Sequence, residues 1–139
     1  MILYADSSSL AKLYIEEEGS AETKEATRRA ERVVSSLVAY AELRAALARA
    51  RSNTRITENE FHLARARLDA DWRAMLVIAV SNIIVERAGD LADRYLIRGF
   101  DAVHLASAGQ MRELNQGEVR FSTADRRLRD AAVAEGFAV

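Results

Sequence analysis

Short apolar runs alternate with longer segments of helical periodicity along most of the chain. Runs of this length, bounded by polar or turn residues, are typical of buried strands. They lie at 2–5, 33–36, 76–80, 118–122 and 137–139. Between them, apolar residues recur at a spacing of three and four, which predicts amphipathic helices. These helices are expected at about 7–17, 20–32, 37–51, from 57 onward, 81–96, 101–115 and 124–135.

Alternation of strands and helices predicts an α/β fold in which a parallel sheet is covered on both faces. We therefore expect a three-layer α/β/α sandwich with a central, mainly parallel sheet of four to five strands. The 139 residues, half of them hydrophobic, suit one domain over 1–139. The clearest buried strand is 76–80, and its apolar run is far too short to span a bilayer. "TENE" at 57–60 predicts a capping box at a helix start.

Composition excludes several classes of function. The net charge is −1, so no overall field favours nucleic acid or membranes. There is no cysteine, which excludes thiolate catalysis, disulfides and cysteine-ligated zinc and fits a cytoplasmic protein. The first residues lack the pattern of a signal peptide. The sequence contains neither G-x-G-x-x-G nor G-x-x-x-x-G-K, the glycine-rich motifs of nucleotide-binding proteins.

Four carboxylates lie near the carboxyl ends of predicted strands or at the start of the helix that follows. We call them the acidic quartet: Asp6, Glu42, Asp101 and Asp125. Ligands of open α/β sheets bind beyond the carboxyl ends of the strands, so the quartet is expected to line one crevice. A structural interpretation also exists, because Asp6 and Asp101 could be helix N-caps and Asp125 could complement a helix dipole. Both interpretations stay open at this point.

Glu42 is the hardest of the four to explain structurally. Its helical neighbours at three and four residues are Val38, Ala39, Ala45 and Ala46, so no local ion pair is available. A carboxylate on an apolar face is costly without a partner, and the sequence shows no evident buried cation. Oxygen-only ligands suit Mg²⁺ or Mn²⁺, and such ions assist hydrolysis of phosphodiesters. The quartet therefore predicts a divalent metal site.

At these positions the chain resembles the PIN-domain nucleases, specifically the VapC-type toxins. The matching stretches keep the family's order: "YADSSSLAKLYIEEEGS" at 4–20, "VSSLVAYAELRAAL" at 34–47, "RGFDAVHLASA" at 98–108 and "FSTADRRLRDAA" at 121–132. The resemblance implies an endoribonuclease that depends on Mg²⁺ or Mn²⁺, with the acidic quartet as its catalytic and metal-binding residues. It places Ser8 and Thr123 beside the metal. It also implies a homodimer that a VapB-type antitoxin neutralises in a hetero-oligomer.

RNA must also be held, and basic residues near the quartet are candidates. We single out Lys12, Arg44, Arg126 and Arg127 as phosphate contacts, although each could belong to a solvated helix face.

His104 is expected to be a core residue with its hydrogen bonds satisfied, on an apolar helix. No G-x-S-x-G motif supports a serine hydrolase. The competing function is an inactive PIN-like module that only binds RNA or a protein.

Overall fold

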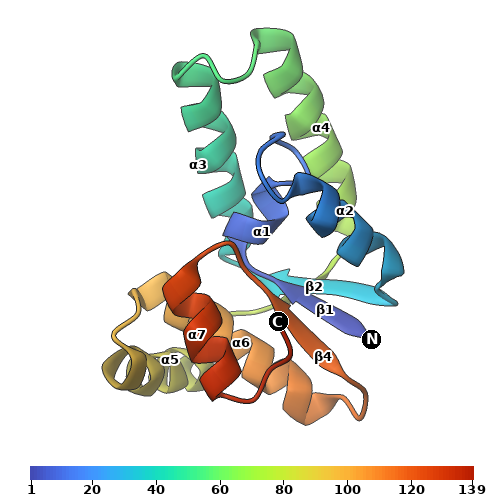
Figure 1. Ribbon diagram of the computed structural model, residues 1–139. Helices are drawn as coiled ribbons and strands as arrows, with labels where there is room; N and C mark the ends of the chain where they lie inside the picture. Colours follow the sequence, from blue (N-terminus) through green and yellow to red (C-terminus); the bar gives the residue numbers. More distant parts are fainter.

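Four parallel strands form the central sheet of the computed structural model, which describes residues 1–139. Their order across the sheet is β3-β2-β1-β4 (Figure 1). The bounds are β1 (Ile2–Ala5), β2 (Arg32–Ser36), β3 (Leu76–Ile78) and β4 (Val119–Ser122). The predicted α/β class with a mainly parallel sheet is confirmed.

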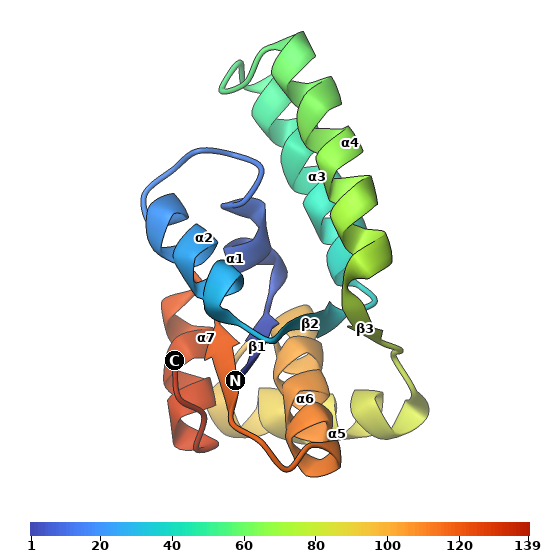
Figure 2. The same cartoon turned by 90° about the vertical axis from the view of Figure 1, so that its right-hand side faces the viewer.

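Helices cover both faces of the sheet. They are α1 (Ser7–Ala11), α2 (Ser20–Arg29), α3 (Ala39–Ser52), α4 (Glu58–Ala74), α5 (Asn82–Tyr95), α6 (Gly99–Leu114) and α7 (Arg126–Ala134). In Figure 1, α1 to α4 lie above the sheet and α5 to α7 lie below it. Figure 2 shows α3 and α4 as a hairpin that extends beyond the other elements. The arrangement is the expected three-layer sandwich. No helix is both long and apolar enough to cross a membrane.

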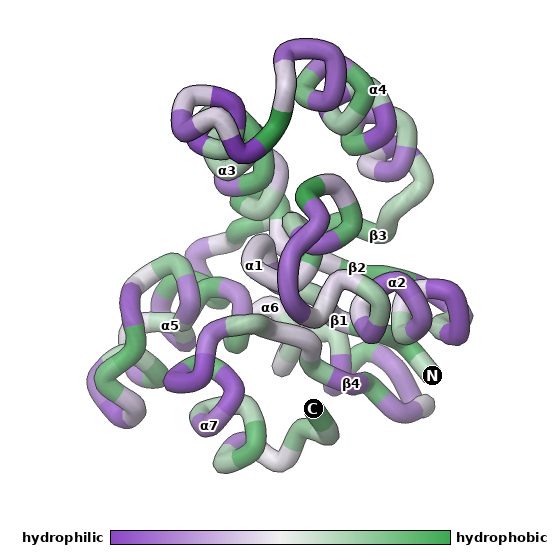
Figure 3. The backbone as a smooth tube through the Cα atoms, turned by 45° about the horizontal axis from the view of Figure 1, so that its top comes forward, coloured by the Kyte–Doolittle hydropathy of each residue, from purple (hydrophilic) through white to green (hydrophobic).

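Two hydrophobic cores fill the spaces between the layers. The core below the sheet joins β1, β2 and β4 to α5, α6 and α7, with Tyr4, Leu105 and Phe121 almost fully buried. The core above the sheet is built around α1, α3 and α4, with Leu10 and Leu68 at its centre. Hydrophobic and hydrophilic residues alternate along α4 (Figure 3), because one side of this helix faces a core.

The helix predicted at 7–17 is wrong in extent, because α1 ends at Ala11. The chain then turns back to Gly19, whose φ of +84° lies in the left-handed region that favours glycine. Lys12 stabilises this turn, since its ammonium pairs with Glu17 and donates to the carbonyl of Glu18. These contacts stabilise a turn where the sequence predicted that the helix would continue.

Two strand predictions also need correction. The segment 76–80 is not the best-buried strand. Only Leu76–Ile78 is extended, and Leu76 is 39% exposed, because β3 is an edge strand that pairs with β2 alone. Residues 137–139 make only an isolated bridge, between Ala138 and Arg120, and form no fifth strand.

The strand order reverses once, and this reversal positions the site. The chain passes from β1 to β2 and β3 on one side, and β4 lies on the other side of β1. The crevice of such a sheet opens beyond the strand ends at the switch point, here between β1 and β4. The register pairs Ala5 with Ser122, so the next residues, Asp6 and Thr123, emerge side by side.

Candidate active site

Asp6 lies at the centre of a hydrogen-bond network at the end of β1. It is the N-cap of α1, and its Oδ1 accepts from the backbone N–H of Ser9 at 2.8 Å. The Ser8 hydroxyl donates to both carboxylate oxygens, at 2.8 and 2.9 Å, and Thr123 donates to Oδ2 at 2.7 Å. Asp6 is only 2% exposed, and this burial raises the pKa of its carboxyl, although the hydrogen bonds oppose the shift.

The same network fixes the loop after β4. The backbone N–H of Ala124 donates to Ser8 Oγ at 2.9 Å, and that of Asp125 donates to Thr123 Oγ1 at 3.0 Å. Asp125 is in turn the N-cap of α7, where its Oδ1 accepts from the N–H of Leu128 at 2.8 Å. The two predicted supporting residues, Ser8 and Thr123, thus join the ends of β1 and β4.

Glu42 has a partner that the sequence did not reveal. It lies in the first turn of α3, and its Oε1 is 2.7 Å from Nε2 of His104, 62 residues away. The other ring nitrogen, Nδ1, is 3.0 Å from the Tyr4 hydroxyl. His104 is 1% exposed, so the expectation of a satisfied core histidine is confirmed. Glu42 thus has a partner from a distant helix, which the absence of a basic residue on its own helix did not reveal.

Arg98 is a second residue that sequence reasoning missed. It is the N-cap residue of α6, so Asp101 lies in the first turn and does not cap the helix. Its Nε donates to Asp101 Oδ2 at 3.0 Å, and its Nη2 is 3.5 Å from Asp125 Oδ2. The i, i+3 spacing from Arg98 to Asp101 was the available signal. This guanidinium offsets part of the repulsion between two acids from different helices.

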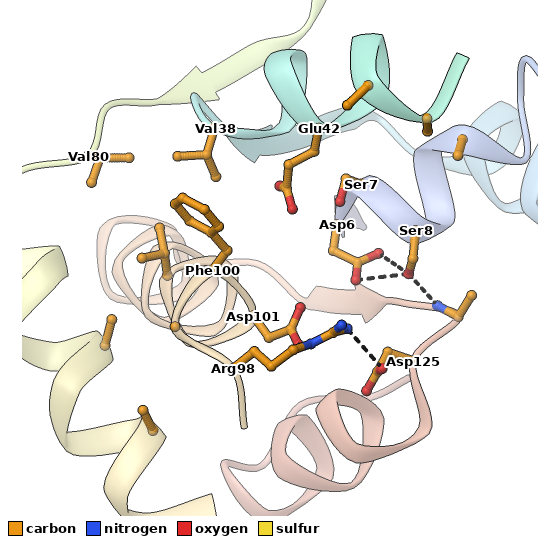
Figure 4. A pocket seen from close by; sticks show the side chains of 18 of the residues that line it. Asp6, Ser7, Ser8, Val38, Glu42, Val80, Arg98, Phe100, Asp101 and Asp125 are labelled. Carbon is orange, nitrogen blue, oxygen red and sulfur yellow. Dashed lines mark hydrogen bonds and ion pairs between the residues drawn. The ribbon is translucent and has the colours of Figure 1, made fainter. Parts of the chain in front are cut away.

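All four acids line one pocket of about 1050 Å³. In Figure 4, Asp6, Asp101 and Asp125 lie toward one end of it, and Glu42 extends from α3 toward them. The other end is apolar and is lined by Val38, Val80 and Phe100, among others (Figure 4). The predicted convergence of residues 6, 42, 101 and 125 on a shared pocket is therefore seen.

The side chains of the pocket do not form a ready-made metal-binding site. No group of three or more Asp, Glu, His or Cys side chains has an arrangement ready to hold a cation. Arg98 instead pairs with two of the acids, Asp101 and Asp125. The donor set nevertheless fits a hard divalent cation, because every side chain of the quartet offers carboxylate oxygens and hydroxyls support Asp6.

The predicted RNA contacts divide into two groups. Lys12 is engaged with Glu17, and Arg44 donates to the Tyr40 hydroxyl at 2.8 Å, so both are committed to contacts within the chain. Their assignment as phosphate contacts stays a prediction. Arg126 and Arg127, in the first turn of α7, are exposed and form no ion pair. Arg49, on α3, also lines the pocket.

Comparison with known proteins identifies the family. A family model for the PIN domain matches residues 3–134. The chain belongs to the PIN-domain family. Two curated relatives from Mycobacterium tuberculosis are each 36% identical to this PIN domain over 137 residues, which cover 97% of the chain and 92% of the relative. They are Ribonuclease VapC45 of strain CDC 1551 / Oshkosh and Ribonuclease VapC49 of strain ATCC 25618 / H37Rv.

The identity to these relatives shows that the chain is a VapC-type PIN domain. A solved structure, a toxin-antitoxin complex from Klebsiella pneumoniae, superposes with a TM-score of 0.61 at 21% identity. The match covers 90% of this chain and 87% of that one. At this level of identity the structural likeness supports the fold.

Proposed function

We propose that this VapC-type PIN domain is a metal-dependent endoribonuclease toxin that a cognate antitoxin neutralises. One observation carries the proposal: the acidic quartet comes from four distant segments and lines a single pocket. The relatives that are 36% identical over nearly the whole chain are named ribonucleases, which supports the same activity here. Mg²⁺ is the proposed cofactor, with Mn²⁺ as a substitute.

Each residue of the quartet has a defined part in this proposal. Asp6, whose orientation Ser8 and Thr123 fix, binds the cation together with Glu42 and Asp101. Asp125 completes the set through Oδ2, because its Oδ1 caps α7. A bound divalent cation would polarise a phosphoryl oxygen and lower the pKa of water. Arg126 and Arg127 are proposed to hold RNA phosphates beside this pocket.

Asp101→Asn gives the cleanest test of the mechanism, because Asp101 caps no helix and its loss should leave the fold intact. The protein is incubated with total RNA in Mn²⁺ or in EDTA, and the cut ends are mapped. We expect discrete cuts with 5′-phosphate ends from the wild type in Mn²⁺. The variant should lose at least about a hundredfold in rate, since metal ligation supplies several kcal/mol. Expression of the wild type without an antitoxin should arrest growth, and expression of the variant should not.

Asp130→Asn is the matched control, because Asp130 is an exposed acid of α7 that forms no ion pair. It should cleave as the wild type does. Cleavage in EDTA, or full activity of Asp101→Asn, would contradict the proposed mechanism. Binding of RNA without cleavage in Mn²⁺ would instead support the alternative of an inactive PIN-like module. The homodimer and the cytoplasmic location stay predictions.

A further inference from the structure

A buried histidine connects the core beneath the sheet to the pocket. His104 projects from α6, and both of its ring nitrogens lie within hydrogen-bond distance of another side chain. One partner is Tyr4, which is fully buried in β1. The other is Glu42, whose side chain is 29% exposed and lines the pocket. The three residues therefore form a chain of contacts that begins in the core and ends at a proposed metal ligand.

The ionised Glu42 carboxylate can only accept, so Nε2 of His104 carries the N–H of their contact, whereas the direction of the contact with Tyr4 depends on the protonation of Nδ1. In the tautomer proposed below, the Tyr4 hydroxyl donates to Nδ1 of His104, 3.0 Å away. An imidazole that accepts at Nδ1 is neutral and bears its only N–H at Nε2. That N–H then donates to Oε1 of Glu42, at 2.7 Å. The result is a carboxylate held by a neutral donor.

We propose that His104, in the Nε2–H tautomer that its contacts with Tyr4 and Glu42 favour, is a positioning residue that orients Glu42 for the divalent cation. This inference rests on the proposed function. His104 occupies Oε1, and no protein group donates to Oε2, which leaves that oxygen for the ligand. Hydrogen bonds from neighbouring groups that orient metal ligands commonly change metal affinity by about ten- to a hundredfold.

A neutral donor suits this task better than a charged one. A lysine or arginine at position 104 would cancel the negative charge that attracts the cation. Neutral imidazole fixes the direction of the carboxylate and leaves its charge intact. Arg98 shows the contrast, because it pairs with Asp101 and Asp125 as a full positive charge. The Arg98 side chain is 79% exposed on the surface, whereas His104 is buried in the core.

Nuclear magnetic resonance tests the tautomer without any metal. The chain has two histidines, and His62 is an internal reference because its side chain is 62% exposed. In a long-range ¹H–¹⁵N spectrum at neutral pH, His104 is expected as the Nε2–H tautomer. Tyr4→Phe should shift the Nδ1 resonance of His104, because the hydrogen bond to this nitrogen is lost, and should leave the His62 signals unchanged. A wild-type His104 in the Nδ1–H form would overturn the inference.

Titration with Mn²⁺ alone, followed by electron paramagnetic resonance, tests the positioning. We expect His104→Leu to weaken Mn²⁺ binding by about tenfold. His104→Gln should retain more affinity, because its amide keeps an N–H donor. His62→Leu, the matched control, should bind as the wild type does. Equal Mn²⁺ affinity for the wild type and a folded His104→Leu variant would overturn the positioning role.

Circular dichroism and thermal unfolding establish whether His104→Leu is folded. If it is not, Tyr4→Phe decides, since it removes only one oxygen atom from the core. Mn²⁺ binding that Tyr4→Phe weakens a few-fold supports the inference, and unchanged Mn²⁺ binding by this variant overturns it. The outcomes separate the two proposals. A wild type that binds no Mn²⁺ rejects the metal-dependent function itself, whereas wild-type binding that the variants share rejects only the role of His104.

Discussion

At the scale of single residues, capping a helix and lining a pocket prove to be compatible roles. Asp125 uses Oδ1 to cap α7 and turns Oδ2 toward Arg98 in the pocket. Asp6 caps α1 through Oδ1 while it also faces the pocket. The sequence left cap and site as alternatives, but a carboxylate has two oxygens and can serve both. Of the three aspartates, only Asp101 lies in the pocket without capping its helix.

Asp6→Asn is expected to stabilise the protein in EDTA at neutral pH. Burial raises the pKa of Asp6, so the folded state binds this proton more tightly than the unfolded chain does. Stability therefore falls as pH rises from about 3.9, the unfolded value, through the folded pKa. Asparagine cannot ionise, so the variant avoids this loss of stability, and asparagine remains a good N-cap. In EDTA, the midpoint temperature of thermal unfolding of Asp6→Asn should exceed that of the wild type by a few degrees. This difference should widen as pH rises.

Asp130→Asn provides the control for this measurement, because it removes the same charge from the exposed surface of α7. Its unfolding curves should follow those of the wild type. Parallel stability curves for wild type and Asp6→Asn between acid and neutral pH would show that the buried carboxylate carries no such penalty.

The contacts that the sequence could not predict are those between distant segments. The acids themselves stood out because each lies near a predicted strand end or at the start of a predicted helix. Their partners did not, since His104 meets Glu42 and Arg98 meets Asp125 only after the layers have packed. A sequence pattern reports neighbours on one element. It therefore pointed to the four acids that line the pocket but not to the groups that pair with them.

At the scale of elements, periodicity predicted the alternation of strands and helices but not the environment of each strand. The segment 76–80 is as apolar as a central strand, yet β3 lies at the sheet edge beside β2. Its apolar side chains pack partly against the lower core, as Ile78 and Val80 do. The segment 7–17 has a helical pattern, but Lys12 and Gly19 favour a turn that local propensity does not reveal.

The capping box at the start of α4 is a local prediction that the structure confirms. Thr57 accepts from the N–H of Glu60 at 3.1 Å, and Glu60 accepts from the N–H of Thr57 at 3.0 Å. Thr57→Ala should cost about 1 kcal/mol of unfolding free energy, measured in urea, because the cap is removed. Thr57→Ser should retain most of this unfolding free energy, because serine is also a good N-cap. RNA cleavage should not change, since this cap lies at the far end of the α3–α4 hairpin (Figure 1).

An unchanged free energy of unfolding in Thr57→Ala would mean that the cap contributes nothing in this exposed loop. Reduced cleavage in a folded variant would mean that the hairpin end takes part in binding RNA. Either result would be informative about α4, which carries Arg65, Arg67 and Arg73 without ion pairs.

At the scale of the whole molecule, the site exists because of the strand order. The sequence predicted a parallel sheet, and therefore one edge at which all carboxyl ends meet. It did not predict that β1 lies between β2 and β4, which is the arrangement that brings Asp6 beside Thr123. Strand order depends on how helices pack over the sheet, and no local pattern encodes that packing.

The net charge of −1 means that overall attraction cannot hold RNA to this molecule. Binding should depend instead on local arginines at the pocket. In an Asp101→Asn background, which prevents cleavage, the double variant Arg126→Gln/Arg127→Gln should bind a single-stranded RNA more weakly. The slope of log affinity against log salt concentration should also shrink by about 0.7 for each phosphate that the variant no longer neutralises. Fluorescence anisotropy at several KCl concentrations measures both quantities.

Arg28→Gln/Arg29→Gln is the matched control, because it removes the same charge from α2, where both arginines pair with Glu25. Counterion release depends on which cations touch phosphate, and total charge alone does not determine it. The control should therefore keep the wild-type salt slope, while the slope of the variant at 126 and 127 becomes shallower. If both double variants weakened binding equally, RNA would be sensing the charge of the whole surface, and α7 would have no special place in the interface.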